Sequence, residues 1–242
     1  MVDSPEDIIY NVKMLHRLQR YDDAITAVDS FFEVKNVLNK EERSYFFVVY
    51  KTAIDSSRYS YRAIDAYYQQ NSQEGYTARA ELLRKYKVLI AEKIVTIAQK
   101  AIDLINNHLL QSAEDASAQG FFYKMMGDMY RYISETNEGV EQSKSKNDGK
   151  MAYSKAIQIC DENLSPVDPT RLGSILNASV FRYEQLNEKP EAIQMLQDAI
   201  QDIKNCSEEI DPNTQTEVQN AFDTMISNLH HWEHDGEEED VE

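Results

Sequence analysis

Four cationic side chains and one phenol, in two separate stretches of the chain, could together bind a phosphate group. Lys51 and Arg58 are seven residues apart, so on a helix they share one face. Lys124 and Arg131 repeat this spacing further along, and Tyr132 follows directly. Guanidinium forks, an ammonium and a hydroxyl are the donors that a phosphoryl dianion prefers. On spacing alone, solvated charges on helix surfaces remain the commoner explanation for such residues.

A second pattern could hold a peptide main chain. Asn177, Val180 and Glu184 stand at i, i+3 and i+7 on one helical stripe, and Asn228 and Trp232 stand at i and i+4. A side-chain amide offers both donor and acceptor groups, which match those of an extended backbone. The same amides could instead satisfy helix–helix contacts, and the pattern by itself favours that interpretation.

Motifs for catalysis or cofactor binding do not occur in the sequence. His230 and His234 have the i, i+4 spacing of helical zinc ligands, but they stand at the end of the last predicted helix and no third ligand is evident. There is no glycine-rich phosphate loop, zinc-ribbon spacing or nucleophile elbow. We therefore expect neither an enzyme nor a bound metal or cofactor.

The elements that position these residues are predicted to be helices almost throughout. The 242 residues include only five prolines and seven glycines, and after Pro5 the next proline is Pro166. Apolar residues recur at three- and four-residue spacing. We therefore predict an all-α fold of about nine helices, joined by short links and mostly antiparallel to their neighbours.

Local signals predict where several helices begin. Cap residues or prolines mark five starts, at Ser4-Pro5, the capping box Asn39–Glu42, Asp168-Pro169, Pro190 and Asp211-Pro212. The polar stretch 137–149 contains two glycines and is predicted to include a loop, before a helix from about 150 to 163.

Apolar spacing also predicts which side chains of two helices face the interior. In the first helix these side chains are Ile8, Ile9, Val12, Leu15 and Leu18. In the long helix from about 74 to 110 they are Leu82, Tyr86, Ile90, Ile94, Ile97, Ala101, Leu104 and Ile105.

Charge and composition limit the class of partner. The formal net charge of −17 argues against nucleic acid or an anionic membrane as the partner of the whole surface. No apolar run of 18 residues occurs, and the acidic N-terminus lacks the apolar core of a secretory signal. Cys160 and Cys206 fall within helical patterns, which indicates reduced, packed thiols in a cytoplasmic protein.

The end of the chain differs in composition from the rest. Residues 233–242 include seven acids and no Lys or Arg, so we expect a disordered acidic tail after a helical domain spanning 1–232. Such a tail could compete for a cationic pocket, or it could serve only to keep the protein soluble.

Several stretches, in order along nearly the whole chain, resemble the 14-3-3 family of phosphopeptide-binding adaptors. They are Arg20–Asp23 (RYDD), Leu38–Arg43, Val49–Lys51, Ser57–Arg62, Phe122–Tyr132, and the segment from Arg171 to Glu184, which is similar to the family signature RLGLALNFSVFYYE. The resemblance implies a cup-shaped, single-domain protomer of nine helices that dimerises, with itself or a paralogue, through its N-terminal helices. It implies a non-enzymatic adaptor that holds phosphoserine or phosphothreonine segments of client proteins in an amphipathic groove.

The resemblance also assigns roles to individual residues. Lys51, Arg58, Arg131 and Tyr132 would bind the phosphate. Asn177 and Asn228 would bond the peptide main chain, Glu184 would orient neighbouring donors, Lys124 would line the polar wall, and Leu176, Val180 and Trp232 would line the opposite side.

Several residues depart from the family pattern, among them Ser57, which replaces one of two consecutive arginines, and Tyr61, which replaces a tryptophan. Met126 stands in place of a lysine, and Asn220 and Thr224 in place of leucines of the apolar wall. At the dimer face Leu18 replaces a small alanine and Leu89 a lysine that forms an ion pair. These changes bear on client preference and on the strength of dimerisation.

An alternative is a helical-repeat scaffold that binds unphosphorylated peptides. The stretches Arg20–Ile25 and Ala152–Ala156 faintly resemble tetratricopeptide units. No strict period of 34 residues recurs, so this remains the second interpretation.

Overall fold

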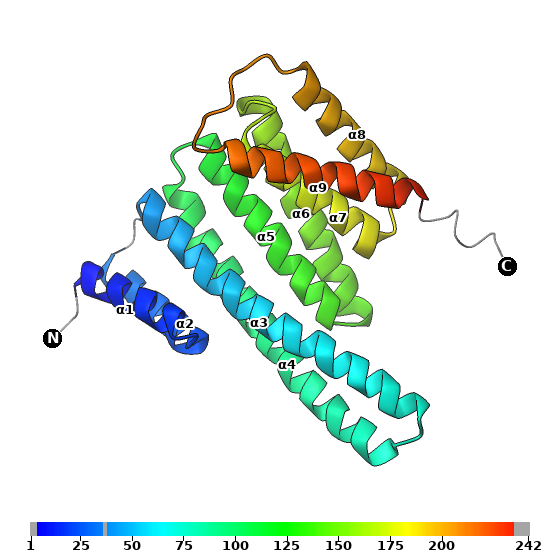
Figure 1. Cartoon of the computed structure of the whole chain (residues 1–242). Coiled ribbons are helices and arrows are strands. Elements are labelled where there is room, and N and C mark those ends of the chain that lie inside the picture. Colours follow the sequence, from blue (N-terminus) through cyan, green and yellow to red (C-terminus); the bar gives the residue numbers. More distant parts are fainter. Residues whose placement is uncertain (1–3, 36–37, 235–242) are drawn as a thin grey trace. The chain divides into compact units, whose positions relative to one another are not determined.

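A computed structural model describes residues 4–35 and 38–234, which contain nine α-helices, two π-helical turns, one 3-10 turn and no strand (Figure 1). By their internal contacts the residues divide into two compact units, one ending at Ser112 and the other beginning at Ala113. The prediction of an all-α fold with about nine helices is confirmed.

The first unit consists of four α-helices that pack in consecutive pairs. They are α1 (Pro5–Arg17), α2 (Tyr21–Val34), α3 (Lys40–Gln73) and α4 (Thr77–Leu104), after which a π-helical turn (Ile105–Leu109) and a 3-10 turn (Leu110–Ser112) follow. α1 packs on α2, α2 on α3, and α3 on α4. In the core, the rings of Phe31 and Phe46 meet edge to face at 5.1 Å and join α2 to α3.

The second unit is a two-layer arrangement of five α-helices. They are α5 (Ala116–Thr136), α6 (Gly139–Asn163), α7 (Pro169–Phe181), which continues into a π-helical turn (Arg182–Leu186), α8 (Lys189–Asn205) and α9 (Gln215–His234). α7 packs between α5 and α9, while α6 packs against α5 and α7, and α8 against α7 and α9. The helices α5, α7 and α9 therefore form one layer, and α6 and α8 form the layer behind it (Figure 1).

Three of the predicted caps begin helices as expected. The Ser4 hydroxyl accepts a hydrogen bond from the backbone N–H of Asp7, with Pro5 in the first turn. Asn39 and Glu42 form a reciprocal capping box at the start of α3. Asp168 accepts from two backbone N–H groups at the start of α7.

The predicted loop within 137–149 is confined to Asn137 and Glu138, and the predicted helix start near 150 is wrong, because α6 begins at Gly139 and continues unbroken from there. The buried side of this part of α6 is formed by Ser145 and Gly149. A Cβ on Gly149 would lie 3.1 Å from the ring of Phe181. Because small and polar residues form the buried side of this part of α6, its sequence lacks the apolar periodicity that indicates a helix.

The predicted helix start at Asp211-Pro212 is also wrong. The Asp211 carboxylate accepts from the backbone N–H of Asn213, and its carbonyl accepts from the N–H of Thr214, which closes a turn. α9 begins only afterwards, at Gln215, and ends at His234. Glu233 and His234, which the sequence assigns to the tail, are therefore helical, and residues 235–242 lie outside the described part of the chain.

Three side chains predicted to face the interior are exposed. Leu18 follows the last residue of α1 and is 68 % exposed, and Leu82 and Tyr86 of α4 are 54 % and 51 % exposed. Periodicity identified the apolar side of α4, but α3 covers it only in part. By contrast, Ile8 and Val12 of α1 and Ile94 of α4 are buried as predicted.

Both cysteines are free thiols, in agreement with the prediction of reduced side chains. Cys160 is fully buried, and burial raises the pKa of its thiol to about 11. Among the described residues, no helix combines the length and the apolar character that a membrane crossing requires.

The close approach of α5 and α6 depends on Gly127, which leads to a stability prediction. A Cβ at this position would lie 2.7 Å from the ring of Tyr153. We expect Gly127→Ala to lower the free energy of unfolding by about 2 kcal/mol, because overpacking outweighs the helix propensity that alanine adds. Urea denaturation measures the change.

Gly173→Ala is the matched control for this substitution. A Cβ on Gly173 would meet only the flexible Lys124 side chain, at 3.8 Å. This variant should be as stable as the wild type or more so. Equal stability of the Gly127→Ala and Gly173→Ala proteins would contradict the packing argument.

Candidate functional site

One face of α5 carries alternating cations and carboxylates. Lys124, Asp128, Arg131 and Glu135 stand at i, i+4, i+7 and i+11, and all four are at least half-buried. Lys124 Nζ donates to Asp128 Oδ2 at 3.1 Å, and Arg131 Nη1 donates to Glu135 Oε1 at 3.3 Å. The two predicted ligands on this helix are therefore held in place by carboxylates on the same helix.

Asp128 is the centre of this arrangement. Its carboxylate is only 3 % exposed and accepts from Tyr153 on α6 at 2.6 Å and from the Asn177 amide on α7 at 2.8 Å. Burial alone would raise the pKa of this carboxyl, but the charges of Lys124 and Arg131 outweigh it, and the pKa lies below its usual value. Asp128 is therefore an ionised group that joins three helices.

The guanidinium of Arg131 is largely shielded from water and only partly paired with carboxylates, so it could bind an anion. Its side chain is 14 % exposed, and its Nη2 lies 3.9 Å from Asp128. Within the described residues, its Nε is the one buried side-chain nitrogen or oxygen that makes no hydrogen bond. Burial opposes the charged form, but Tyr153 and Asp128 more than compensate, so the pKa is raised and the cation persists. Beside it the Tyr132 ring lies 4.7 Å from the guanidinium carbon.

α7 presents an amide of fixed orientation next to α5. The Asn177 Nδ2 donates to Asp128, so its second N–H and its carbonyl oxygen are directed elsewhere. Leu176 and Val180 are half-buried against the core of this unit. Glu184 is exposed and makes no hydrogen bond or ion pair within the second unit.

α9 supplies a stacked tryptophan and a second amide. The Trp232 indole lies parallel to the Tyr183 ring, with centroids 4.3 Å apart, and Lys189 lies over the same tyrosine at 4.9 Å. Asn228 is half-buried one turn before Trp232, and its amide has no hydrogen-bond partner in the described part of the chain. The predicted peptide-contacting residues on α5, α7 and α9 thus belong to one layer of helices.

In the first unit, Lys51 and Arg58 share a face of α3 as predicted. Lys51 Nζ lies 2.5 Å from Asp55 Oδ2, and Arg58 Nη1 lies 3.8 Å from Asp55 Oδ1. Two cations thus lie beside one carboxylate on this face. Lys51 and Arg58 belong to the first unit and Arg131 and Tyr132 to the second, so their convergence on one phosphate is a proposal, taken up below.

Sequence reasoning missed Asp128 and Tyr153. A signal existed for Asp128, which stands four residues after Lys124 and three before Arg131 on a predicted helix. No such signal existed for Tyr153, which reaches Asp128 only because α6 packs closely on α5.

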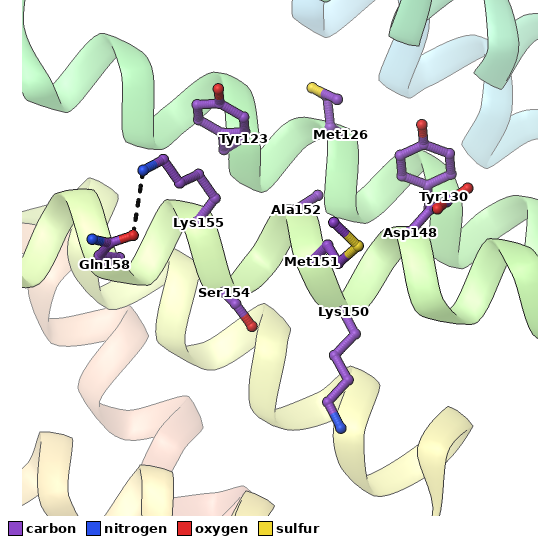
Figure 2. Close-up of a pocket in the computed structure, with 10 residues that line it drawn as sticks. All are labelled: Tyr123, Met126, Tyr130, Asp148, Lys150, Met151, Ala152, Ser154, Lys155 and Gln158. Atoms are coloured by element: carbon purple, nitrogen blue, oxygen red, sulfur yellow. Dashed lines mark hydrogen bonds between the residues drawn. The ribbon is translucent and has the colours of Figure 1, made fainter.

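One cavity lies away from these residues. It has a volume of about 710 Å³ and is formed by α5 and α6 alone, with Tyr123, Met126 and Tyr130 on one side and Met151 and Lys155 on the other (Figure 2). The α5 residues that line it point away from the face of Lys124 and Arg131. We do not take this cavity as the binding site, because neither Lys124 and Arg131 nor the Asn177 amide lines it.

Histidines at the end of α9 do not form a metal centre with other described residues. The rings of His230 and His234 lie 4.9 Å apart. No group of three His, Cys, Asp or Glu side chains suited to a metal occurs in the described part of the chain.

Removing the charge of Asp128 should destabilise the fold in a pH-dependent way. Asp128→Asn leaves Lys124 and Arg131 short of a buried counter-charge, and we expect a loss of about 3 kcal/mol at pH 7. Because the folded-state pKa of Asp128 is lowered, its carboxylate stabilises the fold above pH ~4, and this contribution disappears at lower pH. Urea denaturation should show that the free energies of unfolding of Asp128→Asn and the wild type differ less at pH 3 than at pH 7.

Asp161→Asn is the control, since Asp161 pairs with Arg171 but is 46 % exposed. It should cost no more than about 1 kcal/mol. A loss for Asp128→Asn as small as that of the control, or one independent of pH, would contradict the role of Asp128.

Comparisons with known proteins agree with this geometry. The family model described as "14-3-3 protein" matches residues 11–233. The "Checkpoint signal transducer rad24" of Schizosaccharomyces pombe is 34 % identical over 210 residues, which cover 85 % of this chain and 78 % of the relative. The match includes the helices that carry the cations, the buried Asp128 and the oriented amide. The chain therefore belongs to the 14-3-3 family of adaptor proteins.

Proposed function

We propose that this protein is a non-enzymatic adaptor that binds segments of client proteins containing phosphoserine or phosphothreonine, and so regulates their activity, location or assembly. The observation that carries the proposal is the buried Arg131 guanidinium, with an Nε that has no partner among the described residues. Nε itself is too buried to contact a ligand, but the side chain is 14 % exposed, so a phosphate oxygen could accept from an accessible N–H of the guanidinium. A phosphoryl dianion also matches a guanidinium better than a single carboxylate does.

The family resemblance assigns Lys51, Arg58, Arg131 and Tyr132 to the proposed phosphate site. Lys51 and Arg58 would contribute two cations from α3, and Arg131 and Tyr132 would contribute a guanidinium and a phenol from α5. Asp55 and Asp128 hold these cations in place before the client binds, which lowers the entropy lost on binding.

The proposed peptide site uses the layer of α5, α7 and α9. The orientation of the Asn177 amide leaves one N–H and the carbonyl for the client main chain, and Asn228 offers a second amide. Lys124 lines the polar side, and Leu176, Val180 and Trp232 line the apolar side. Glu184 would orient donors nearby. Main-chain recognition of this kind reads an extended segment without requiring particular side chains.

We also propose that the protein dimerises, with itself or a paralogue, through its N-terminal helices. Leu18, Leu82, Tyr86 and Leu89 are all more than half exposed in the first unit, so these apolar side chains are available for contact with a second chain. Where the family has an ion pair, Leu89 would supply an apolar contact. We propose further that the helical domain, which the sequence places over 1–232 and which α9 extends to His234, acts in the cytoplasm and carries an acidic tail.

Phosphate dependence can be tested with a serine-containing peptide, its phosphorylated form and fluorescence anisotropy. The wild type should bind the phosphorylated peptide far more tightly. Arg58→Ala and Arg131→Ala should each weaken that binding by about 10- to 100-fold, as expected for charge-assisted hydrogen bonds. Their binding of the unphosphorylated peptide should not change.

Lys155→Ala is the control for this experiment. Lys155 is an exposed cation on α6, so its loss changes the net charge equally but leaves the proposed site intact. Equal affinity of the wild type for both peptides would overturn the phosphate site. Enrichment of unphosphorylated peptides from a library would instead favour a helical scaffold of the tetratricopeptide kind.

Dimerisation can be tested by sedimentation equilibrium. Leu18→Glu and Leu89→Glu should each weaken the dimer at least tenfold, while Val140→Glu, at an exposed apolar position of the second unit, should not. The wild-type dimer should persist in 0.5 M salt, because apolar contacts are not screened (Debye length about 4 Å). A wild-type monomer, or dissociation by salt alone, would refute an apolar interface.

A further inference from the structure

A strip of uncharged polar residues runs along the exposed side of α9. Successive residues of an α-helix are rotated by about 100°, so Asn220, Thr224, Ser227 and His231 lie within about 60° of one another. All four are exposed. We call these four residues the α9 polar strip. In a chain with a formal net charge of −17, so long an uncharged strip is conspicuous.

The contacts of α9 show which way this strip faces. Trp232 stacks on Tyr183 at the end of α7, and Glu233 accepts a hydrogen bond from Gln197 of α8. Going around the axis of α9 in one direction, the side that contacts α8 (Glu233) is followed by the side that contacts α7 (Trp232). Asn228 comes next, and the α9 polar strip comes last. The strip therefore lies beyond the α7 contact, on the side of α9 that is turned away from α8.

On α7, Asn177 lies on the same face of the layer of α5, α7 and α9 as the α9 polar strip does on α9. It is half-buried on α7 and bonds to Asp128 on α5, while α6 and α8 cover the back of α7. The strip, Asn228 and Asn177 thus follow one another across the layer of α5, α7 and α9. A client segment held by the two amides would place its neighbouring side chains on the strip.

The strip has hydrogen-bonding groups to offer. The Thr224 hydroxyl donates to the backbone carbonyl of Asn220 at 2.7 Å and can still accept. The side chains of Asn220 and Ser227 make no hydrogen bond within the described residues. An apolar client side chain placed here would remove these groups from water without replacing their hydrogen bonds, whereas a polar one would pair with them.

We infer that the α9 polar strip selects clients with uncharged hydrogen-bonding side chains (Ser, Thr, Asn or Gln) beside the phosphorylated residue, against clients with apolar side chains there. This inference rests on the proposed function and names the client class. Two exposed carboxylates, Glu217 and Asp223, stand at the two edges of the strip, so an acidic client side chain is not its ligand.

The test uses peptides with a central phosphoserine in an otherwise constant sequence. Each position within four residues of the phosphoserine carries either Asn or Leu, one position at a time, and anisotropy gives each Kd. For the wild type, at least one position should favour Asn over Leu by about tenfold. The variant Asn220→Leu/Thr224→Leu should lose or reverse this preference at the same position.

Controls separate side-chain chemistry from folding. Thr224→Val keeps the shape of the side chain and removes only the hydroxyl, so it should reduce the preference even if the double variant folds poorly. Gln219→Leu removes an exposed amide from another side of α9 and should leave the preference unchanged.

The outcomes distinguish this inference from the proposed function. If phosphorylation does not raise the affinity of the wild type, the proposed function fails. If phosphorylation raises affinity but Asn and Leu bind equally, or Leu binds more tightly, the phosphate site stands and the role of the α9 polar strip is overturned. A preference for Asn that persists in Asn220→Leu/Thr224→Leu would also overturn it.

Discussion

The buried carboxylate of Asp128 is the interaction on which the rest of the site depends. A lone carboxylate in the interior would be strongly unfavourable, so it requires cations and donors around it. Lys124 and Arg131 provide the charge, and Tyr153 and Asn177 provide hydrogen bonds from two other helices. Satisfying one anion therefore fixes the positions of two cations and one amide, before any client is present.

This arrangement requires α5 and α6 to pack closely. The Tyr153 ring lies over Gly127, where any side chain would displace it, and its hydroxyl then meets Asp128 one residue further along. Gly149 allows a similar approach of α6 to Tyr130 and to Phe181 of α7. Glycines within these helices lower intrinsic helix propensity, so close packing must offset that loss.

The sequence predicted the helical fold and the spacing of cations on single helices, because both follow from local rules. The caps at Ser4, Asn39 and Asp168 are interactions within a few residues, and the shared face of Lys51 and Arg58 follows from helix geometry. The proposed peptide-contacting residues were assigned by resemblance rather than by spacing.

Features set by packing between distant segments were not predictable in this way. The start of α6 has small residues in its interface, so its periodicity was absent, and Tyr153 is brought to Asp128 by tertiary packing alone. The exposure of Leu18 and Tyr86 depends on which side of a helix another helix covers, which apolar spacing does not specify. The same exposure is consistent with contact to another chain.

We propose that Asp128 prepares Arg131 to receive a phosphate, and the affinities of one peptide pair can test this. The ratio of Kd values for a peptide with and without its phosphate should be compared between the wild type and Tyr153→Phe, whose hydroxyl bonds to Asp128. The ratio should fall several-fold in the variant while binding of the unphosphorylated peptide stays the same. An unchanged ratio in a folded Tyr153→Phe protein would contradict the claim.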